Sequence, residues 1–467
     1  MGTCAQLFYS SDSSKETLTS RISLSSEQDD LQRDKHKKVF EYLKVGLSRI
    51  YPQEAQWLPR LQGSVQYGTQ IRPMAINDEY DIDLGVYALQ QKDATEFSDD
   101  AANYKANIQE LLLEYLDIDD DAKEVMNPDK KFCCRLHFVG NFHVDIVAYH
   151  QNTDEDIRLA ATKHGEWVNT DPKKIYDWFK NTVSDVTHRV RMRRMIKYLK
   201  CWAALHFDGD NDSKPSSIYL TILCANSYKK LARTGAITDN DDECLYALLN
   251  DICSHVSPLY EPYEENPVDP TENICRISIT HWDAFKSKLT SFLRTAQLAN
   301  SAAPIESPLL WGVAFKHFMP QPSESVLNST TLPALWNIPD VEIIANHQTA
   351  NRRNVKVNAV GPIGKSFDLH FKVQNPSAFP VDARVKWTIR NHGAEAGTQN
   401  DLGHENEETG LYESIQENTA YNGIHYVDCV IFSDSNGSLY GYRRVPVNIQ
   451  DSSHLRNPRS IPRGPRR

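Results

Sequence analysis

The alternation of apolar and polar residues predicts two differently built parts of the chain. Residues 80–88 and 132–149 alternate in polarity at the two-residue period of half-buried strands. Apolar residues recur at the three- and four-residue spacing of a buried helix face in four other segments: 39–50, 104–116, 175–179 and 188–206. After residue 340, short alternating runs are separated by turns that contain Asn, Gly and Pro. The expected fold class is therefore an α/β (α+β) core with a helical half, followed by an all-β, sandwich-like domain.

Changes in composition mark where these parts begin and end. A chain of 467 residues predicts two or three domains, at about 150 residues per domain. The first residues are rich in Ser and Thr, a stretch rich in Pro, Ser and Asn precedes the all-β part, and the last residues are rich in Arg. In chain order we expect a flexible lead-in (1–28), the core with its helical half (29–320), a linker (321–339), the β-rich domain (340–450) and a flexible basic tail (451–467).

Two carboxylates share one face of the strand predicted over residues 80–88. The two-residue period places Asp81 and Asp83 on one face and apolar residues on the other. Asp145 points away from the apolar face of a later predicted strand in the same way. If the two strands are neighbours, the three carboxylates surround one cleft, and their oxygens suit Mg²⁺, with Mn²⁺ as an alternative. Two such ions can hold the phosphates of a nucleotide for in-line transfer of a nucleotidyl group.

A Gly-Ser pair precedes the first two carboxylates. Gly63 allows the backbone to approach a phosphate closely, and Ser64 can cap a helix or donate a hydrogen bond to a phosphate oxygen. An isolated Asp-x-Asp is usually a solvated strand face, and an isolated Gly-Ser pair is weaker still. The whole combination, in which this pair, the Asp-x-Asp and an Asp-bearing strand follow one another, is far more specific and favours a phosphate-handling site.

Net charge and cysteine content exclude some classes of protein. The chain has 51 basic and 62 acidic residues, a net charge of -11, which excludes a passive coat on nucleic acid but not a metal-dependent site for phosphates. No apolar run approaches the ~20 residues that span a bilayer. The nine cysteines are scattered, without a CxxC motif or a His/Cys cluster at zinc-ligand spacing, and indicate free thiols in a reducing cytoplasm.

At these residues the chain resembles the polymerase-β-like nucleotidyltransferases, and within them the bacterial CD-NTase (SMODS) family, which is related to the cyclic GMP–AMP synthases. Three further segments carry the narrower resemblance: Trp167–Phe179, Arg194–Trp202 and Lys214–Leu220. The resemblance covers about residues 30–320 and implies that Asp81, Asp83 and Asp145 bind two Mg²⁺ ions. It also implies nucleotide contacts from five residues: Gly63, Ser64, Lys200, Ser216 and Ser217. From the residues alone, the two serines after Pro215 can equally be helix caps.

The β-rich part carries a second resemblance, in the segments Val385–Trp387, Asn391–Gly393 and Tyr421–Cys429. They look like the adenylyl/guanylyl-cyclase and SMODS C-terminal sensor domain (AGS-C), which is found fused to such transferases in bacterial anti-phage operons. Taken alone, the Asn-Gly step at 422 is a hairpin turn and Trp387 is a core residue. We therefore assign no site to this domain.

The resemblance leaves the product open. The family in general makes cyclic di- or trinucleotides from nucleoside triphosphates. Members with this C-terminal domain resemble the Hailong-type anti-phage enzymes, which build linear single-stranded DNA from deoxynucleoside triphosphates, start from a hydroxyl in their own C-terminal region and control a membrane effector encoded nearby. Ser452, Ser453 and Ser460 lie in the Arg-rich tail and are the candidate priming hydroxyls, although such a tail is also typical of plain disorder. We place linear synthesis slightly ahead of cyclic synthesis, and we keep a catalytically idle nucleotide sensor and a homo-oligomer as further hypotheses.

Overall fold

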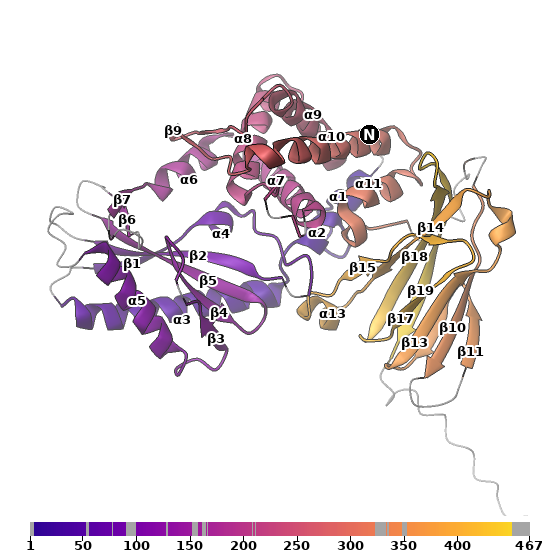
Figure 1. Ribbon diagram of the computed structural model, residues 1–467, viewed down its shortest axis with the longest axis horizontal. Coiled ribbons are helices and arrows are strands. Elements are labelled where there is room, and N and C mark those ends of the chain that lie inside the picture. Colours follow the sequence, from indigo (N-terminus) through magenta and orange to yellow (C-terminus); the bar gives the residue numbers. More distant parts are fainter. Residues whose placement is uncertain are drawn as a thin grey trace, which may run out of the picture. The chain divides into compact units, whose positions relative to one another are not determined.

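The structure is a computed structural model. It describes residues 4–52, 56–76, 78–89, 100–127, 129–151, 157–160, 165, 167–207, 209–210, 212–322, 333, 336–347 and 353–450. The chain forms two compact units (Figure 1). The first unit comprises Met1–Ala5 and Ile22–Arg294, and the second comprises Gln6–Arg21 and Thr295–Arg467.

A mixed sheet lies at the centre of the first unit. Its seven strands in the described part of this unit are β1 (Gln56–Leu61), β2 (Tyr80–Leu89), β3 (Ala122–Val125), β4 (Cys134–Phe138), β5 (Phe142–Gln151), β6 (Ile157–Ala160) and β7 (Trp167–Asn169). The strand order is β1-β2-β5-β4-β3, with β6 paired to β5 and β7 paired to β6. β2 and β5 run parallel, and the other pairs are antiparallel. Two strands that are distant in the sequence thus become central neighbours.

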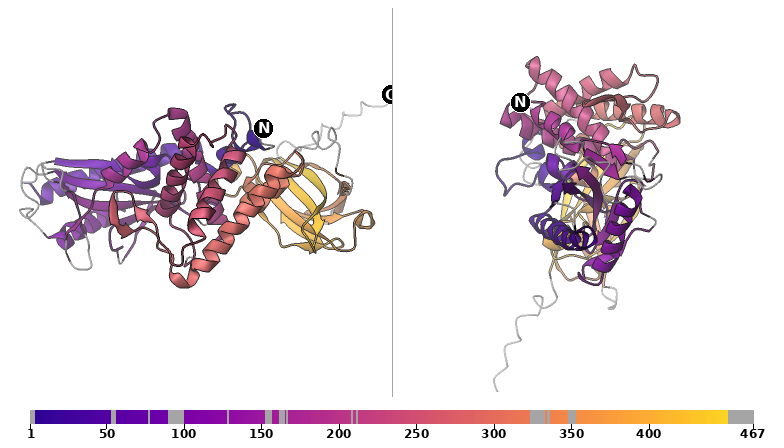
Figure 2. Two further views of the ribbon diagram at one scale, coloured as in Figure 1. Left: turned by 90° about the horizontal axis from the view of Figure 1, so that it is seen from above. Right: turned by 90° about the vertical axis from the view of Figure 1, so that its left-hand side faces the viewer.

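Two long helices cover one face of this sheet. α3 (Ser26–Ile50) and α5 (Ala101–Tyr115) lie side by side, as the views of Figures 1 and 2 agree. Ile82 and Leu84 of β2 are fully buried and share one core with Leu43 of α3 and Ile108 of α5. Because side chains alternate along a strand, the polar residues of β2 are left on the opposite face of the sheet.

Helices dominate the remainder of the first unit. They are α4 (Gly63–Tyr67), α6 (Pro172–Asn181), α7 (Val186–His206), α8 (Ser217–Arg233), α9 (Asp241–Val256) and α10 (Ile279–Ser301), of which the part up to Arg294 belongs here. A small hairpin of β8 (Glu265–Asn266) and β9 (Asp269–Asn273) accompanies them. Side chains that accept hydrogen bonds from backbone N–H groups start three of these helices: Asp171 for α6, Asp185 for α7 and Ser216 for α8. Trp202 of α7 stacks on Phe292 of α10 at 4.9 Å between ring centroids, so α7 and α10 share a common core.

The second unit is a β-sandwich. One sheet has the order β11 (Arg353–Val357), β10 (Val341–His347), β13 (Phe367–Val373), β17 (Ser414–Asn418). The other has the order β12 (Val360–Ile363), β19 (Leu439–Ile449), β18 (Gly423–Ser433), β14 (Ala383–Arg390), β15 (Gly403–Glu405), with β16 (Thr409–Gly410) paired to β14. Phe371 and Trp387, one from each sheet, are buried in a single core, so the sheets pack face to face. The expected fold class is confirmed.

Short helices complete the second unit. They are α1 (Ala5–Phe8), of which all but the first residue belongs here, α2 (Leu18–Ile22), of which all but the last residue does, α11 (Ser307–Phe315) and α13 (Ala394–Thr398), with the 3₁₀ turns η2 (Lys316–Phe318) and η3 (Pro376–Ala378). Their buried side chains extend the core of the unit beyond the two sheets.

The start of the chain differs from the flexible lead-in that its composition predicts. Phe8 and Leu18 are fully buried, and the ring of Phe8 packs edge-on against Trp311 of α11 with 4.9 Å between ring centroids. Arg21 forms an ion pair with Glu16 in the same segment. A few large apolar side chains therefore anchor a segment whose average composition is polar.

The boundary between the units also differs from the expected linker. The second unit begins at Thr295, within α10, whereas the Pro-rich stretch that we took for the linker starts at residue 321. Proline-rich composition marks a loop, but a boundary lies where contacts across the chain become few. The tail 451–467, with Ser452, Ser453 and Ser460, lies outside the described residues.

Two further expectations concern the state of the cysteines and the presence of membrane-spanning helices. All nine cysteines are free and buried. None of the helices in the described ranges combines the length and the apolar character that a bilayer span needs.

Candidate active site

Three carboxylates meet on the polar face of the central sheet. Asp81 and Asp83 lie on β2, and Asp145 lies on β5. The parallel pairing of the two strands places Asp83 directly opposite Asp145. Because paired strands lie about 4.8 Å apart, the three side chains form one cluster. The structure thus meets the condition that the sequence left open, namely that the two strands are neighbours.

Gly63 brings the backbone against the carboxylate of Asp83. It is the first residue of α4, and the N–H of the preceding residue, Gln62, donates to the carbonyl oxygen of Asp83 at 2.8 Å. The φ angle of Gly63 is +53°, and a Cβ atom there would lie 2.0 Å from Oδ2 of Asp83. Only glycine fits this position. Ser64 follows in α4, and its hydroxyl has no hydrogen-bond partner among the described residues.

Arg135 is a residue of the site that sequence reasoning missed. It lies on β4 directly opposite Asp145 in the antiparallel pairing, and its guanidinium holds that carboxylate at two points, Nε to Oδ1 at 2.6 Å and Nη2 to Oδ2 at 2.7 Å. Burial alone would raise the pKa of Asp145, but the hydrogen bonds and charge of Arg135 outweigh burial and hold this pKa below its usual range. The turn at Gly140 predicts a hairpin whose register would have paired these two residues.

Asp83 is the carboxyl of the cluster whose ionised form is disfavoured by its neighbours. Burial, together with the charges of Asp81 and Asp145, raises the pKa of Asp83 to about 7, although the cations of Lys200 and Arg135 act in the opposite direction. In the metal-free site Asp83 therefore stays protonated up to about pH 7 and ionises above it. A divalent cation bound at the same oxygens would replace that proton.

Lys200 lies beside the first two carboxylates. It is buried on α7, and its Nζ is 3.3 Å from both the carbonyl oxygen and Oγ1 of Thr69. Burial lowers the pKa of Lys200 to about 8, while the charges of Asp81 and Asp83 favour its protonated form. Cations held by Asp81 and Asp83 would attract an anion such as a phosphate. The buried ammonium group of Lys200 lies beside these carboxylates and is placed to bind the same anion.

Ser216 and Ser217 lie at the start of α8. The hydroxyl of Ser216 accepts a hydrogen bond from the backbone N–H of Tyr219 at 3.3 Å, so this side chain caps the helix. Ser217 is exposed, and the next residue, Ile218, lines the same cavity as Gly63 and Asp83. The structure thus gives Ser216 a capping role and leaves Ser217 outside the residues that line the cavity, one position before Ile218.

Of the three carboxylates, Asp83 lines a cavity of about 850 Å³ in the first unit. Its lining includes Gly63, Asp83, Tyr149, Ile218 and Arg276. Cavities of roughly 300–1,000 Å³ hold ligands of nucleotide size. The cavity is therefore large enough for nucleotides next to the carboxylates.

Tyr149, which lines this cavity, belongs to a stacked aromatic pair. The rings of Tyr87 and Tyr149 stack at 4.5 Å between centroids. Gln62 fixes both, because its Nε2 donates to the hydroxyl of Tyr87 at 2.8 Å and its Oε1 accepts from that of Tyr149 at 3.1 Å. Gly85 leaves room for this arrangement, since a Cβ atom there would lie 2.6 Å from the ring of Tyr87.

The donor set fits a pair of hard divalent cations. It consists of carboxylate oxygens, and within the described residues neither Asp81 nor Asp83 accepts a side-chain hydrogen bond that would occupy its lone pairs. Asp145 is held by Arg135, but each carboxylate oxygen has two lone pairs and can accept a guanidinium and a cation together. Asp81, Asp83 and Asp145 are thus the residues that would hold the ions.

We expect Lys200→Met to weaken binding of nucleoside triphosphate by about 10- to 100-fold, which corresponds to the loss of one or two hydrogen bonds to a charged group. Lys197→Met is the matched control. Lys197 lies one helical turn earlier on α7, and its Nζ contacts Ser23, away from the carboxylates. Titration calorimetry on both variants checks this. Equal weakening in the two would contradict the assignment of Lys200 to the nucleotide.

Comparisons with known proteins identify two domains and several relatives. The family model described as cyclic GMP-AMP synthase DncV-like, nucleotidyltransferase domain, matches residues 59–149, and the one described as adenylyl/guanylyl and SMODS C-terminal sensor domain matches residues 323–450. A protein named cyclic GMP-AMP synthase from Escherichia albertii is 28% identical over 455 residues, 97% of this chain and 98% of that protein. A protein named c-di-GMP synthase from Roseivirga ehrenbergii is 24% identical over 254 residues, 48% of this chain and 62% of that protein.

Solved structures share the fold. The di-nucleotide cyclase DncV of Vibrio cholerae, in complex with GTP and 5MTHFGLU2, aligns with a TM-score of 0.55 at 19% identity, covering 68% of this chain and 96% of that one. Escherichia coli DncV in its 3'-deoxy GTP bound form aligns with a TM-score of 0.54 at 18% identity, covering 67% and 96%. The polymerase-β-like fold expected for the core is thereby confirmed. The chain is a nucleotidyltransferase whose core matches the DncV-like domain of the CD-NTase (SMODS) enzymes and whose second unit matches the adenylyl/guanylyl and SMODS C-terminal sensor domain.

Proposed function

We propose that the protein joins purine ribonucleoside triphosphates into a cyclic dinucleotide in a metal-dependent reaction. The observation that carries the product class is the similarity to a protein named cyclic GMP-AMP synthase over 97% of this chain and 98% of that protein. That similarity spans the C-terminal sensor domain as well as the core. The second domain therefore does not by itself favour a linear DNA product, which was the reason for ranking that product first.

The chemistry is attack of a ribose hydroxyl oxygen on the α-phosphorus of a bound triphosphate. The new bond forms between these two atoms, the bond from the α-phosphorus to the bridging oxygen breaks, and pyrophosphate leaves. A second transfer of the same kind closes the ring. Divalent cations, when bound, would neutralise charge on the phosphates and make the attacking hydroxyl more acidic.

The residues of the chain divide this work. Asp81, Asp83 and Asp145 would hold the two ions, and Asp145 is the candidate that accepts the hydroxyl proton. Arg135 supports that role because it keeps Asp145 ionised. We propose that four other residues contact the phosphates: Gly63, Ser64, Lys200 and Ser217. Ser216 caps α8 instead.

Linear, self-primed DNA synthesis remains the second candidate. It rests on the resemblance of the AGS-C domain to that of the Hailong-type enzymes, and its priming serines lie in the tail outside the described residues. The predictions of an anti-phage role, of a membrane effector encoded nearby, of an oligonucleotide as partner and of a homo-oligomer have the same origin. Nine free thiols support a reducing compartment, for which we propose the cytoplasm.

Substrate choice separates the two candidates. Purified full-length protein is incubated with Mg²⁺ and α-labelled ATP plus GTP, or with the four labelled dNTPs, and an Asp83→Ala/Asp145→Ala variant serves as the blank. Cyclic synthesis predicts conversion of the ribonucleotides well above the blank and little use of dNTPs. Preferential incorporation of dNTPs would support the second candidate and contradict the first.

The raised pKa of Asp83 predicts a pH profile that depends on Mg²⁺. Protonated Asp83 cannot bind a cation, so at low Mg²⁺ the activity should rise with pH through about 7. Protons and Mg²⁺ compete for the same oxygens, so tenfold more Mg²⁺ should move the midpoint of this rise to lower pH by up to about one unit. Initial rates from pH 5.5 to 8.5 at several Mg²⁺ concentrations measure it. A midpoint that does not respond to Mg²⁺ would contradict the competition.

A further inference from the structure

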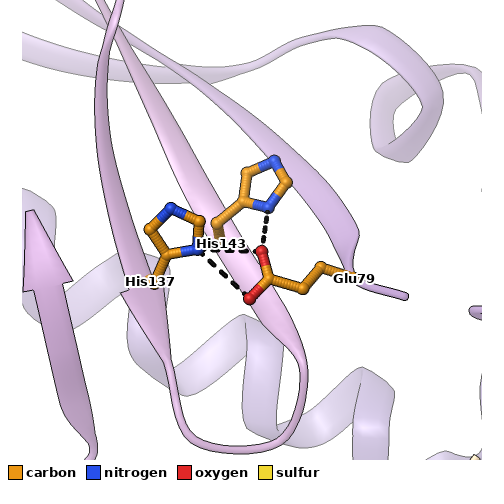
Figure 3. A group of neighbouring side chains, drawn as sticks. All are labelled: Glu79, His137 and His143. Carbon is orange, nitrogen blue, oxygen red and sulfur yellow. Dashed lines mark hydrogen bonds and ion pairs between the residues drawn. The ribbon is translucent and has the colours of Figure 1, made fainter. Parts of the chain in front are cut away.

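A second cluster of ligand-type side chains lies next to the catalytic carboxylates on the same face of the sheet. Glu79 points its carboxylate toward the rings of His137 and His143 (Figure 3). Oε2 of Glu79 is 2.8 Å from Nδ1 of His137 and 2.9 Å from Nδ1 of His143. One carboxylate oxygen and the two ring nitrogens all lie within 4.8 Å of one another.

The strand registers build this cluster. β4 and β5 form a hairpin in which His137 lies directly opposite His143. In the neighbouring parallel pair, His143 lies opposite Asp81. Glu79 precedes β2 by one residue and continues the side of the strand that carries Asp81, because alternate residues share a face. The cluster is therefore the next row of side chains along the sheet, beside the row that holds Asp83 and Asp145.

His143 is able to present its Nδ1 atom as a ligand. The residue is only 7% exposed, and its Nε2 is buried without a hydrogen-bond partner among the described residues. No acceptor or donor in the described part of the chain therefore fixes the ring tautomer through Nε2. The ring proton can reside on Nε2, which leaves a lone pair on the Nδ1 atom that faces Glu79 and His137.

The donor chemistry differs from that of the catalytic carboxylates. Two imidazole nitrogens and one carboxylate oxygen are a ligand set for borderline transition ions, with further positions open to water, whereas Mg²⁺ prefers oxygen alone. The N···O separations of 2.8–3.1 Å are close to those between ligands that share an ion with bonds of ~2.0–2.2 Å. Glu79 would exchange its hydrogen bonds to the two rings for a shared ion.

We propose that Glu79, His137 and His143 bind one divalent transition-metal ion, of the Zn²⁺ class, at a site separate from the catalytic carboxylates. Nothing in the assignment of Asp81, Asp83 and Asp145 requires this ion. The charge of this ion would lie beside Asp81. Binding of the ion would therefore link the availability of transition metal to the electrostatics of the catalytic carboxylates.

Cobalt is the probe, because Co²⁺ bound by imidazoles in a site of low coordination number absorbs visible light. Untagged full-length protein carrying Asp83→Asn/Asp145→Asn, which weakens the catalytic carboxylates as ligands, is stripped of metal and titrated with Co²⁺. We expect one equivalent of Co²⁺ with a visible band, and displacement of that band by one equivalent of Zn²⁺, since Zn²⁺ generally binds such sites more tightly. Millimolar Mg²⁺ should leave the band unchanged.

His137→Gln in that background removes one ligand. The side chain of His137 is 17% exposed, and Gln can still donate to Glu79, so the fold should tolerate the change. We expect the Co²⁺ affinity to fall by at least about tenfold. Glu79→Gln should give a similar loss and serves if His137→Gln does not fold, as judged by circular dichroism and thermal unfolding.

His281→Gln is the control for adventitious binding to an exposed histidine. His281 lies on α10, and its side chain is 39% exposed. This variant should bind Co²⁺ like the background. The proposal is overturned if the background protein gives no visible band, if His137→Gln and Glu79→Gln bind Co²⁺ as tightly as the background, or if His281→Gln weakens binding as much as they do.

Discussion

Replacing Asp83 with Asn is expected to reduce nucleotidyl transfer by ~1,000-fold or more and to stabilise the metal-free protein at alkaline pH. The loss follows because several kcal/mol of transition-state stabilisation depend on cations that Asp83 would hold, and each 1.4 kcal/mol is about tenfold in rate. On this replacement the metal-free protein becomes more stable at alkaline pH because burial and the charges of Asp81 and Asp145 raise the pKa of Asp83 to about 7, so its ionised form is unfavourable in the folded state. Asn has nearly the same shape and cannot ionise.

The sign of the stability effect follows from proton binding. The pKa of Asp83 lies above its ordinary value of 3.8, so between about pH 4 and pH 7 the folded protein binds this proton more tightly than the unfolded chain. The contribution of Asp83 to stability is therefore lost as pH rises toward 7. The advantage of Asp83→Asn over the wild type in free energy of unfolding should grow by about 2–3 kcal/mol from pH 5 to pH 8.

Urea unfolding in EDTA at the two pH values measures this difference. Asp120→Asn is the control, because Asp120 is an exposed carboxylate away from the site and its replacement should change neither activity nor the pH dependence. Mg²⁺ with a triphosphate should raise the melting temperature of the wild type and do so much less for Asp83→Asn. A stability gap that shrinks toward pH 8 would contradict the electrostatic account of the cluster.

Gly63→Ala is expected to lower activity by at least ~100-fold, although it removes no functional group. A Cβ atom at this position would lie 2.0 Å from Oδ2 of Asp83, so the carboxylate must move. A displacement of ~1 Å in a catalytic constellation can cost about 100-fold. The φ of +53° adds strain of about 1–2 kcal/mol for a residue with a Cβ atom.

Gly68→Ala separates the strain from the collision. Gly68 ends α4 with a φ of +68°, and the nearest atom to an added Cβ is 3.4 Å away, on the flexible side chain of Arg193. Both variants should lose similar stability, about 1–2 kcal/mol, while Gly68→Ala keeps activity within about tenfold of the wild type. Parallel measurements of kcat/KM and urea unfolding check this. Equal losses of activity in the two variants would mean that strain in α4, not the carboxylate contact, explains the need for Gly63.

The carboxylate face could be predicted from sequence because it depends on local periodicity. Alternation along β2 and β5 determines that Asp81, Asp83 and Asp145 point away from the apolar core. That the two strands pair, with Asp83 opposite Asp145, depends on a parallel contact between distant segments. No local pattern encodes that register, so the sequence predicts the cluster only on the condition that the two strands are neighbours.

Arg135 and the histidine cluster show the opposite case. Their placement follows from a short hairpin, whose turn at Gly140 and Asn141 was readable from the sequence. No CxxC motif of a zinc site accompanies His137 and His143 along the chain. They become neighbours across the hairpin, and Glu79, one residue before β2, joins them. A search by strand pairs rather than by spacing would have found them.

The flexible lead-in was predicted from average composition, and that average concealed its anchors. Phe8 and Leu18 are two residues among many serines and threonines, yet both are fully buried. A segment becomes ordered when a few side chains bury enough apolar area to offset the entropy of the rest. Composition alone does not report whether those few side chains find a partner.

The form of the labelled product tests the central claim most directly. Wild-type protein is incubated with α-labelled ATP and GTP and Mg²⁺, the protein is removed, and the filtrate is treated with alkaline phosphatase before mass spectrometry. A cyclic dinucleotide has no terminal phosphate, so we predict label in a phosphatase-resistant species of dinucleotide mass in the protein-free fraction, absent with Asp83→Asn. Label that stays with the protein until protease treatment, or label that phosphatase releases as inorganic phosphate and otherwise leaves only in linear fragments, would contradict cyclic dinucleotide synthesis.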